Sequence, residues 1–319
     1  HEAMQNTTTG GANVAIGVDA LYANITGAGN VAIGNLALDT STAISNTIAI
    51  GKGSLRTNTT GVSNTAIGHE ALGLNTTGGD NVAVGYGALD ANTTASNNTG
   101  VGYLALAANT TGADNTAVGK GALDATTTGS YNVGVGVNSM GTNTTGTQNA
   151  AFGRSSLSAN TTGASNVAIG NHALGANTTG DANTSVGYQA LDAATTASNN
   201  TAMGHSALGA NTTGAGNVAV GASALDAATT ADHNVAVGVN ALGRATTGTT
   251  NTSIGHEAAE NITTGDNNVC VGYISGTDAV HNIVTSDNRI VVGNNSHTNA
   301  YIKIDWTVTS DERDKMNFG

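Results

Sequence analysis

A 17-residue period runs through most of this 319-residue chain and limits its possible folds more than any other feature. Sixteen units follow one another without a gap from residue 13 to residue 284. Position one of the unit is Asn in fifteen units, position five is Gly in all sixteen, and position nine is Leu in thirteen. A fixed period of this length is typical of solenoids and fibres, in which each repeat contacts mainly its neighbours.

The first five positions of each unit predict a short β-strand that ends in a corner. In residues 166–170 (Asn-Val-Ala-Ile-Gly) the second and fourth side chains share one face, and Ala lies on the other. We expect Val and Ile to face the core, with Leu at position nine as a second apolar anchor. Gly at position five permits a sharp bend. The Asn-Thr-Thr-Gly segment has the composition of a turn, and residues 69–72 have room for one helical turn only.

One unit alone is too small to fold, because a few aliphatic side chains cannot offset the entropy of ordering the whole unit. The units must therefore stack, with Asn over Asn and Thr over Thr, into a rod of roughly 75–80 Å at about 4.8 Å per rung. Position three is always Ala, Gly, Ser or Cys, which would let another chain approach closely. The predicted fold is all-β: a parallel β-solenoid or β-roll of 17-residue repeats, in an intertwined or side-by-side homotrimer.

The composition limits the possible partners. The formal net charge is −12, and the nine Lys and Arg residues are scattered, which argues against nucleic acid as a partner. No apolar run is long enough for membrane insertion, and no signal peptide is recognised. The single cysteine, Cys270, stands at position three and is expected to be a small buried residue. No cofactor is expected.

A weaker pattern has twice the period. Position ten tends to alternate between Gly and Asp, as in Gly175, Asp192, Gly209 and Asp226. Either the duplication of a 34-residue block or a structural unit of two repeats would produce it.

The Asn-Val-Ala-Ile-Gly units resemble the head repeats of trimeric autotransporter adhesins. That resemblance covers about five residues of each unit and implies a left-handed parallel β-roll in a trimer. Residues 1–4 (His-Glu-Ala-Met) match residues 69–72, so the chain starts within a unit and further repeats are expected upstream.

The period stops after residue 284, and residues 285–309 read as a β-rich neck. Residues 289–293 are a strand candidate, and Ile302, Ile304, Trp306 and Val308 alternate with polar residues. This alternation favours a core role for Trp306 over ligand stacking. We expect the neck to close the open edge of the last rung.

Residues 310–319 resemble the start of the intramolecular chaperone domain of endosialidase-type bacteriophage tail fibres and spikes. The signature Ser-Asp-x-Arg-x-Lys is matched by Ser310, Asp311, Arg313 and Lys315. The resemblance implies a domain that trimerises, assists folding and is released by self-cleavage. Ser310 would then be the nucleophile and Lys315 its base, a pairing that is chemically sound for a desolvated lysine. The chain ends at Gly319, so nearly all of that domain lies outside this sequence.

Other candidate sites have simpler explanations. His1, His69, His205 and His256 share position six, where other units carry Tyr, Lys or Val, so an exposed variable position is favoured over a metal site. His281 lies in the last unit and His297 in the neck, and no metal is expected at either. The glycines around Val135 belong to the repeat rather than to a dinucleotide loop.

The sequence is compatible with three functions. The first is the structural shaft of a homotrimeric bacteriophage tail fibre, extracellular on the virion, that presents surfaces to a host receptor, either a glycan or an outer-membrane component. The second is the stalk or head of a bacterial trimeric adhesin at the cell surface. The third, a glycan-degrading spike, is disfavoured because no insertion or aromatic-rich cleft interrupts the repeat. Apart from the Ser–Lys self-cleavage, we therefore expect no enzymatic activity.

Overall fold

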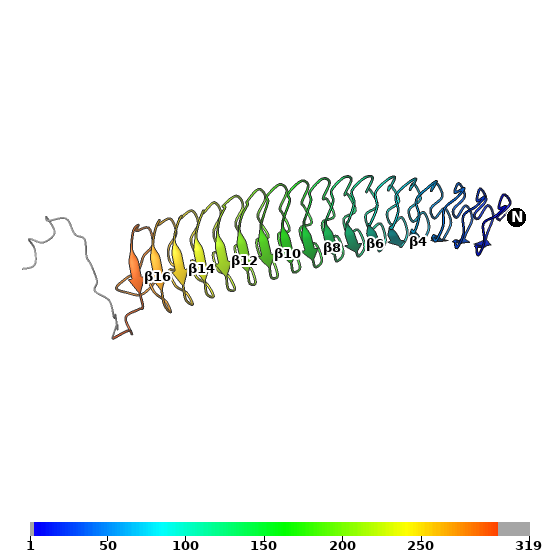
Figure 1. The fold of residues 1–319 in the computed structure, drawn as a ribbon. Coiled ribbons are helices and arrows are strands. Elements are labelled where there is room, and N and C mark those ends of the chain that lie inside the picture. Colours follow the sequence, from blue (N-terminus) through cyan, green and yellow to red (C-terminus); the bar gives the residue numbers. More distant parts are fainter. Residues whose placement is uncertain (1–2, 299–319) are drawn as a thin grey trace, which may run out of the picture.

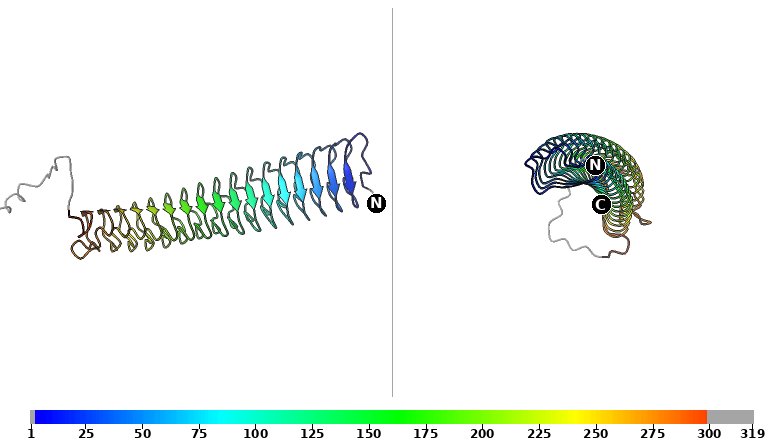
Figure 2. Two further views of the ribbon diagram at one scale, coloured as in Figure 1. Left: turned by 90° about the horizontal axis from the view of Figure 1, so that it is seen from below. Right: turned by 90° about the vertical axis from the view of Figure 1, so that its right-hand side faces the viewer.

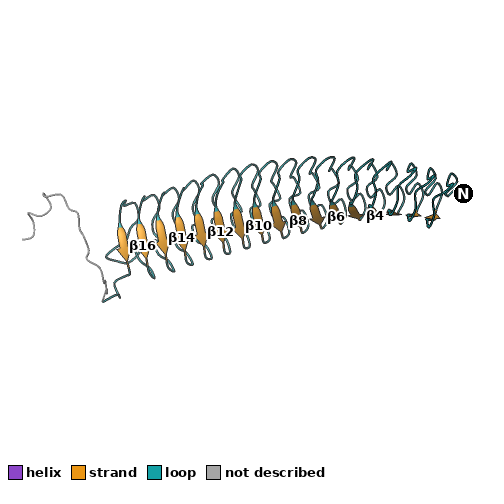
Figure 3. Cartoon of the chain, in the orientation of Figure 1, coloured by secondary structure: helices purple, strands orange, loops and turns teal. Residues whose placement is uncertain are grey.

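The computed structural model describes residues 3–298, and they form one elongated rod of parallel β-strands (Figure 1). The prediction of an all-β parallel solenoid with a 17-residue repeat is confirmed. The described residues contain no helix, and therefore none that is long and apolar enough to cross a membrane (Figure 3).

The seventeen strands, each three residues long, are β1 (Val14–Ile16), β2 (Val31–Ile33), β3 (Ile48–Ile50), β4 (Thr65–Ile67), β5 (Val82–Val84), β6 (Thr99–Val101), β7 (Thr116–Val118), β8 (Val133–Val135), β9 (Ala150–Phe152), β10 (Val167–Ile169), β11 (Thr184–Val186), β12 (Thr201–Met203), β13 (Val218–Val220), β14 (Val235–Val237), β15 (Thr252–Ile254), β16 (Val269–Val271) and β17 (Ile290–Val292).

Each strand pairs in parallel with the next strand in the chain, so one sheet runs the length of the rod. The register places like positions opposite one another, as with Val167 and Thr184 in β10 and β11. Val269 pairs with Ile290, so the step from β16 to β17 spans 21 residues instead of 17. The strand candidate at residues 289–293 is thus one more rung of the same sheet, where a rung is one coil of the solenoid.

The face of each strand that points into the core is the opposite of the one predicted. The position-three side chain is buried, as at Ala168, whereas positions two and four face outwards, and Ile169 keeps 42% of its surface exposed. A Cβ atom at Gly100 would already lie 3.3 Å from Cγ of Leu89 in the preceding rung. Because the interior is this narrow, small residues fill position three in all sixteen units, and a larger one, Val291, occurs there only in the last rung of the described residues.

The rest of the core comes from the far wall of each coil. Ala at position eight and Leu at position nine are fully buried, as at Ala173 and Leu174. Leu174 has a φ of 52° and His172 one of 58°, so the segment between position six and position ten is a left-handed turn. The corresponding residues 69–72 form a turn rather than the single helical turn considered above, because Glu70 and Leu72 have φ values of 56° and 51°.

Buried asparagines form the predicted side-chain ladder along the rod. Asn166 at position one accepts hydrogen bonds at Oδ1 from N and Nδ2 of Asn183, 3.0 and 3.1 Å away. A second ladder runs through position twelve, where Nδ2 of Asn177 donates to Oδ1 of Asn160 at 2.9 Å. The asparagines of both columns make hydrogen bonds to buried main-chain groups that water cannot reach, and this stabilises the thin core.

The rod is also twisted. In a view along the rod, successive coils are rotated in one direction about the long axis, so the sheet winds around the rod (Figure 2). Right-handed twist of individual strands is the general cause of such rotation between paired strands.

Candidate functional surface

The outer face of the sheet is the most extensive unusual surface of the molecule. Positions two and four of the sixteen units carry Val, Ile, Thr, Ala, Phe and Met only, with no charged side chain among them. The more exposed members range from 38% at Ile67 to 73% at Val292, and the others are half-buried. We call this face, built from positions two and four of β1–β17, the strand face.

The strand face is too large for an ordinary monomer surface. Seventeen rungs at about 4.8 Å, two side chains or roughly 10 Å wide, give an area on the order of 800 Å². Monomeric soluble proteins rarely expose contiguous apolar patches above about 300–600 Å². The area is close to the roughly 800 Å² that each partner contributes to a stable protein interface.

Position six carries ladders of aromatic rings beside the glycine corner. His69 stacks on Tyr86 with ring centroids 5.1 Å apart, and Tyr86 stacks on Tyr103 at 5.4 Å. Nζ of Lys120 lies 5.9 Å from the Tyr103 centroid in the next rung. The stacked rings cover part of one another, and Tyr86 and Tyr103 remain about half exposed.

Metal binding gains no support from these histidines. His69, His205 and His256 lie in separate rungs, and each stacks on a tyrosine of a neighbouring rung. No group of three His, Cys, Asp or Glu side chains within residues 3–298 has the geometry to hold a metal ion. His1 lies outside the described residues.

The alternation at position ten has a structural cause. Oδ1 of Asp192 lies 2.5 Å and Oδ1 of Asp226 lies 2.8 Å from the points that Cβ atoms would occupy on Gly175 and Gly209 of the preceding rungs. Each carboxylate thus fills the space over a glycine, so that Asp and Gly alternate as complementary pairs. Burial raises the pKa of both carboxyl groups above its ordinary value. A shallow hollow of about 250 Å³ lies between these two aspartates.

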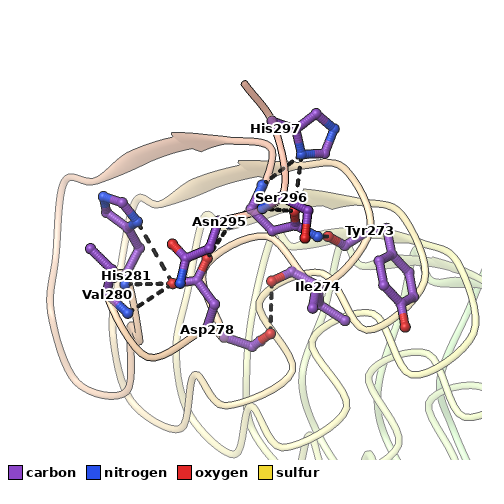
Figure 4. A network of polar contacts seen from close by, with 10 residues as sticks. Tyr273, Ile274, Asp278, Val280, His281, Asn295, Ser296 and His297 are labelled. Atoms are coloured by element: carbon purple, nitrogen blue, oxygen red, sulfur yellow. Dashed lines mark hydrogen bonds and ion pairs between the residues drawn. The ribbon is translucent and has the colours of Figure 1, made fainter. Parts of the chain in front are cut away.

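A polar network stands at the end of the rod, where the last unit has its extra residues (Figure 4). Oδ1 of Asp278 accepts hydrogen bonds from N of Val280 and N of His281, at 2.9 and 2.8 Å. Oδ2 of the same carboxylate accepts one from N of Asn295 at 3.1 Å. His281 Nδ1 lies 3.7 Å from Oδ1. The N–H groups of His281, Val280 and Asn295 hold the pKa of Asp278 below its ordinary value, with the His281 N–H as the largest cause.

Ser310 and Lys315 lie outside the described residues, as does Trp306 with the alternating segment 301–309. The glycines beside Val135 lie in and next to strand β8, so no dinucleotide loop is formed there. Cys270 is buried, as predicted, and burial raises the pKa of its thiol to about 11.

Sequence reasoning missed two features. It assigned the Val and Ile side chains of the strand face to the core, although the alternation had correctly grouped them on one side. It also missed Asp278, for which the four extra residues of the last unit were the available signal.

Comparison with known protein families, with curated proteins and with solved structures finds no match to this chain.

Proposed function

We propose that this chain is the structural shaft of a homotrimeric bacteriophage tail fibre, which extends and presents host-binding surfaces. The observation that carries the proposal is the strand face, a charge-free surface along a regular rod that is apolar at position four of every unit and has Thr at position two of six units. A rod of this kind is suited to be an extended shaft. We expect its strand face to be buried against another protein surface. The same features fit the stalk or head of a bacterial trimeric adhesin, which is the alternative.

The cover that fits best is further copies of this chain. The side chains of the strand face repeat once per rung, and the coils that carry them are rotated progressively along the rod (Figure 2). A partner with another period or twist would lose register within a few rungs. A copy of the same rod shares both, so its apolar side chains interdigitate over the full length. This places the association surface at positions two and four instead of position three, whose side chains are buried inside each coil.

The number three comes from the resemblance of residues 310–315 to a trimerising chaperone domain, and it is part of the proposal. The resemblance also underlies the proposed location on a virion outside the cell and a host-surface glycan or outer-membrane component as receptor. Self-cleavage remains a prediction. In the natural full-length chain, Ser310→Ala should abolish release of the C-terminal domain, and an unchanged product size on gels would count against Ser310 as the nucleophile.

The test of the assembly places charges on the strand face. Lysines at position four of three well-separated rungs would put three cations in the interface of each copy, whose burial without partners is costly. The variant is Ile67→Lys, Ile169→Lys and Ile254→Lys. The matched control changes exposed position-fourteen threonines of the same three rungs: Thr77→Lys, Thr179→Lys and Thr264→Lys.

Light scattering coupled to gel filtration gives the mass of each species, and circular dichroism checks that each variant stays folded. The unchanged chain and the control should be trimers of about three chain masses, whereas the strand-face variant should dissociate to folded monomers. An unchanged chain that is monomeric at micromolar concentration, or a strand-face variant that stays trimeric, would refute the proposal.

A further inference from the structure

The chain leaves the solenoid by a different set of hydrogen bonds from those that connect the regular rungs. In each regular step, the N–H at position seven donates to the carbonyl oxygen at position six of the preceding rung. Glu257 N donates to Val239 O at 2.8 Å, and Ile274 N donates to His256 O at 2.9 Å. Asn295 is the equivalent residue after β17, but its N–H donates to the carboxylate of Asp278 instead.

The carbonyl group that would accept a hydrogen bond from Asn295 in a regular step accepts one from a side chain. Tyr273 O, at position six of the preceding rung, accepts a hydrogen bond from Nδ2 of Asn294 at 3.0 Å (Figure 4). Asn35 makes the same bond to Val18 O in a regular rung, at 3.2 Å and beside the main-chain bond, so only the bond to the Asp278 carboxylate is particular to this step. The chain departs from the path of the solenoid at Asn295, after the last strand has paired.

The four extra residues of the last unit are what supply the carboxylate. N of Ile283 donates to O of Gly276 at 2.8 Å and closes the loop at its base. Within the loop, the N–H groups of Val280 and His281 hold Oδ1 of Asp278, which leaves Oδ2 free to bind Asn295. The Asp278 side chain is only 8% exposed, so its position is fixed on both sides. A carboxylate held by several N–H groups is among the stronger hydrogen-bonding arrangements in proteins.

We propose that Asp278 is a clasp that ends the solenoid and fixes the path of residues 294–297, which follow the last strand. The loop at residues 277–282 holds the carboxylate, and the carboxylate holds residues 294–297. The clasp works within one chain, so it operates whether or not the rod belongs to a fibre.

The test compares hydrogen exchange at the end of the rod in Asp278→Ala, Asp278→Asn and the unchanged chain. Mass spectrometry of peptides that cover residues 291–298 reports the Asn295 amide. Asp278→Ala should raise exchange there at least tenfold. Asp278→Asn keeps one acceptor oxygen, so it should lie between the two. Peptides covering β10–β12 should exchange as in the unchanged chain, which shows that the rod stays folded.

Asp266→Ala is the matched control. Oδ1 of Asp266 accepts a hydrogen bond from N of Thr249 at 2.6 Å, so this carboxylate also binds a main-chain N–H across one rung, but within the regular stack. Its removal should leave exchange at Asn295 unchanged. Equal exchange at Asn295 in Asp278→Ala and the unchanged chain would overturn the proposal. A rise of the same size in Asp266→Ala would do so too, because it would indicate general loosening.

Discussion

Removing one asparagine from the position-one ladder should destabilise the rod far more than removing an asparagine outside the ladder. Asn166 is fully buried. Its Nδ2 donates to Oδ1 of Asn149 at 3.2 Å and to O of Gly180 at 2.8 Å, and its Oδ1 accepts from N and Nδ2 of Asn183. In Asn166→Ala the buried N–H of Asn183 loses its acceptor. Gly180 O keeps only the bond from Asn177 Nδ2.

The magnitude follows from these two main-chain groups. An orphaned buried N–H costs about 1–3 kcal/mol, and the lost bond to Gly180 about 0.5–1.5 kcal/mol more. Asn166→Ala should therefore lower the free energy of unfolding by about 2–4 kcal/mol. The matched control is Asn171→Ala, five residues on, because the Oδ1 of Asn171 has no hydrogen-bond partner. The control should change stability by less than about 0.5 kcal/mol.

Thr47 offers the reverse experiment, because it is the one interruption of the position-one column. Oδ1 of Asn30 accepts from N of Thr47, but Thr47 presents no amide oxygen to the buried Asn64 of the next rung. Thr47→Asn should supply it and raise stability by about 1 kcal/mol. Urea unfolding followed by circular dichroism measures all three variants. If Asn166→Ala is no worse than Asn171→Ala, the ladder does not stabilise the rod.

Three further predictions concern the interior. Oδ1 of Asn109 and Oγ1 of Thr126 are buried without hydrogen-bond partners at one of the interruptions of the position-twelve ladder. Thr126→Asn should join the run of Asn residues that ends at Asn109 to the run that begins at Asn143 and raise the urea midpoint by the equivalent of about 1–3 kcal/mol; a lower midpoint would contradict this. Gly170 has a φ of 135°, and a Cβ there would meet the carbonyl of the next corner glycine, so Gly170→Ala should cost about 2–5 kcal/mol in the same assay. Gly11, where a Cβ would meet nothing within 4 Å, is the control. The Cys270 thiol is buried with a pKa raised to about 11, so a colourimetric thiol reagent at pH 8 should label it only after unfolding, and rapid labelling of the native rod would refute its burial.

The local structure of each rung was predictable because it depends on residues close in sequence. Gly at position five takes a φ near 135° that other residues avoid, as at Gly170. The strand pairs with its neighbour because the period repeats, and the buried asparagines stack for the same reason. The Asp278 clasp was not predictable in this way, because it depends on a loop that occurs only once and on the place where that loop meets Asn295.

The alternation of residue types along the strand does not reveal which face of the strand points into the core. Alternation shows that positions two and four share a side, but volume decides which side is inside. The variation among the units themselves held that information. Position three never exceeds Cys or Ser in size, whereas position four ranges from Val84 to Phe152 and Met203. The core has the same narrow cross-section in every rung, so it cannot accommodate side chains of such different volumes. An outer surface can. The tolerance of position four for different sizes therefore indicates an outer face, and its lack of charge is what the proposed association with further copies of the chain would explain.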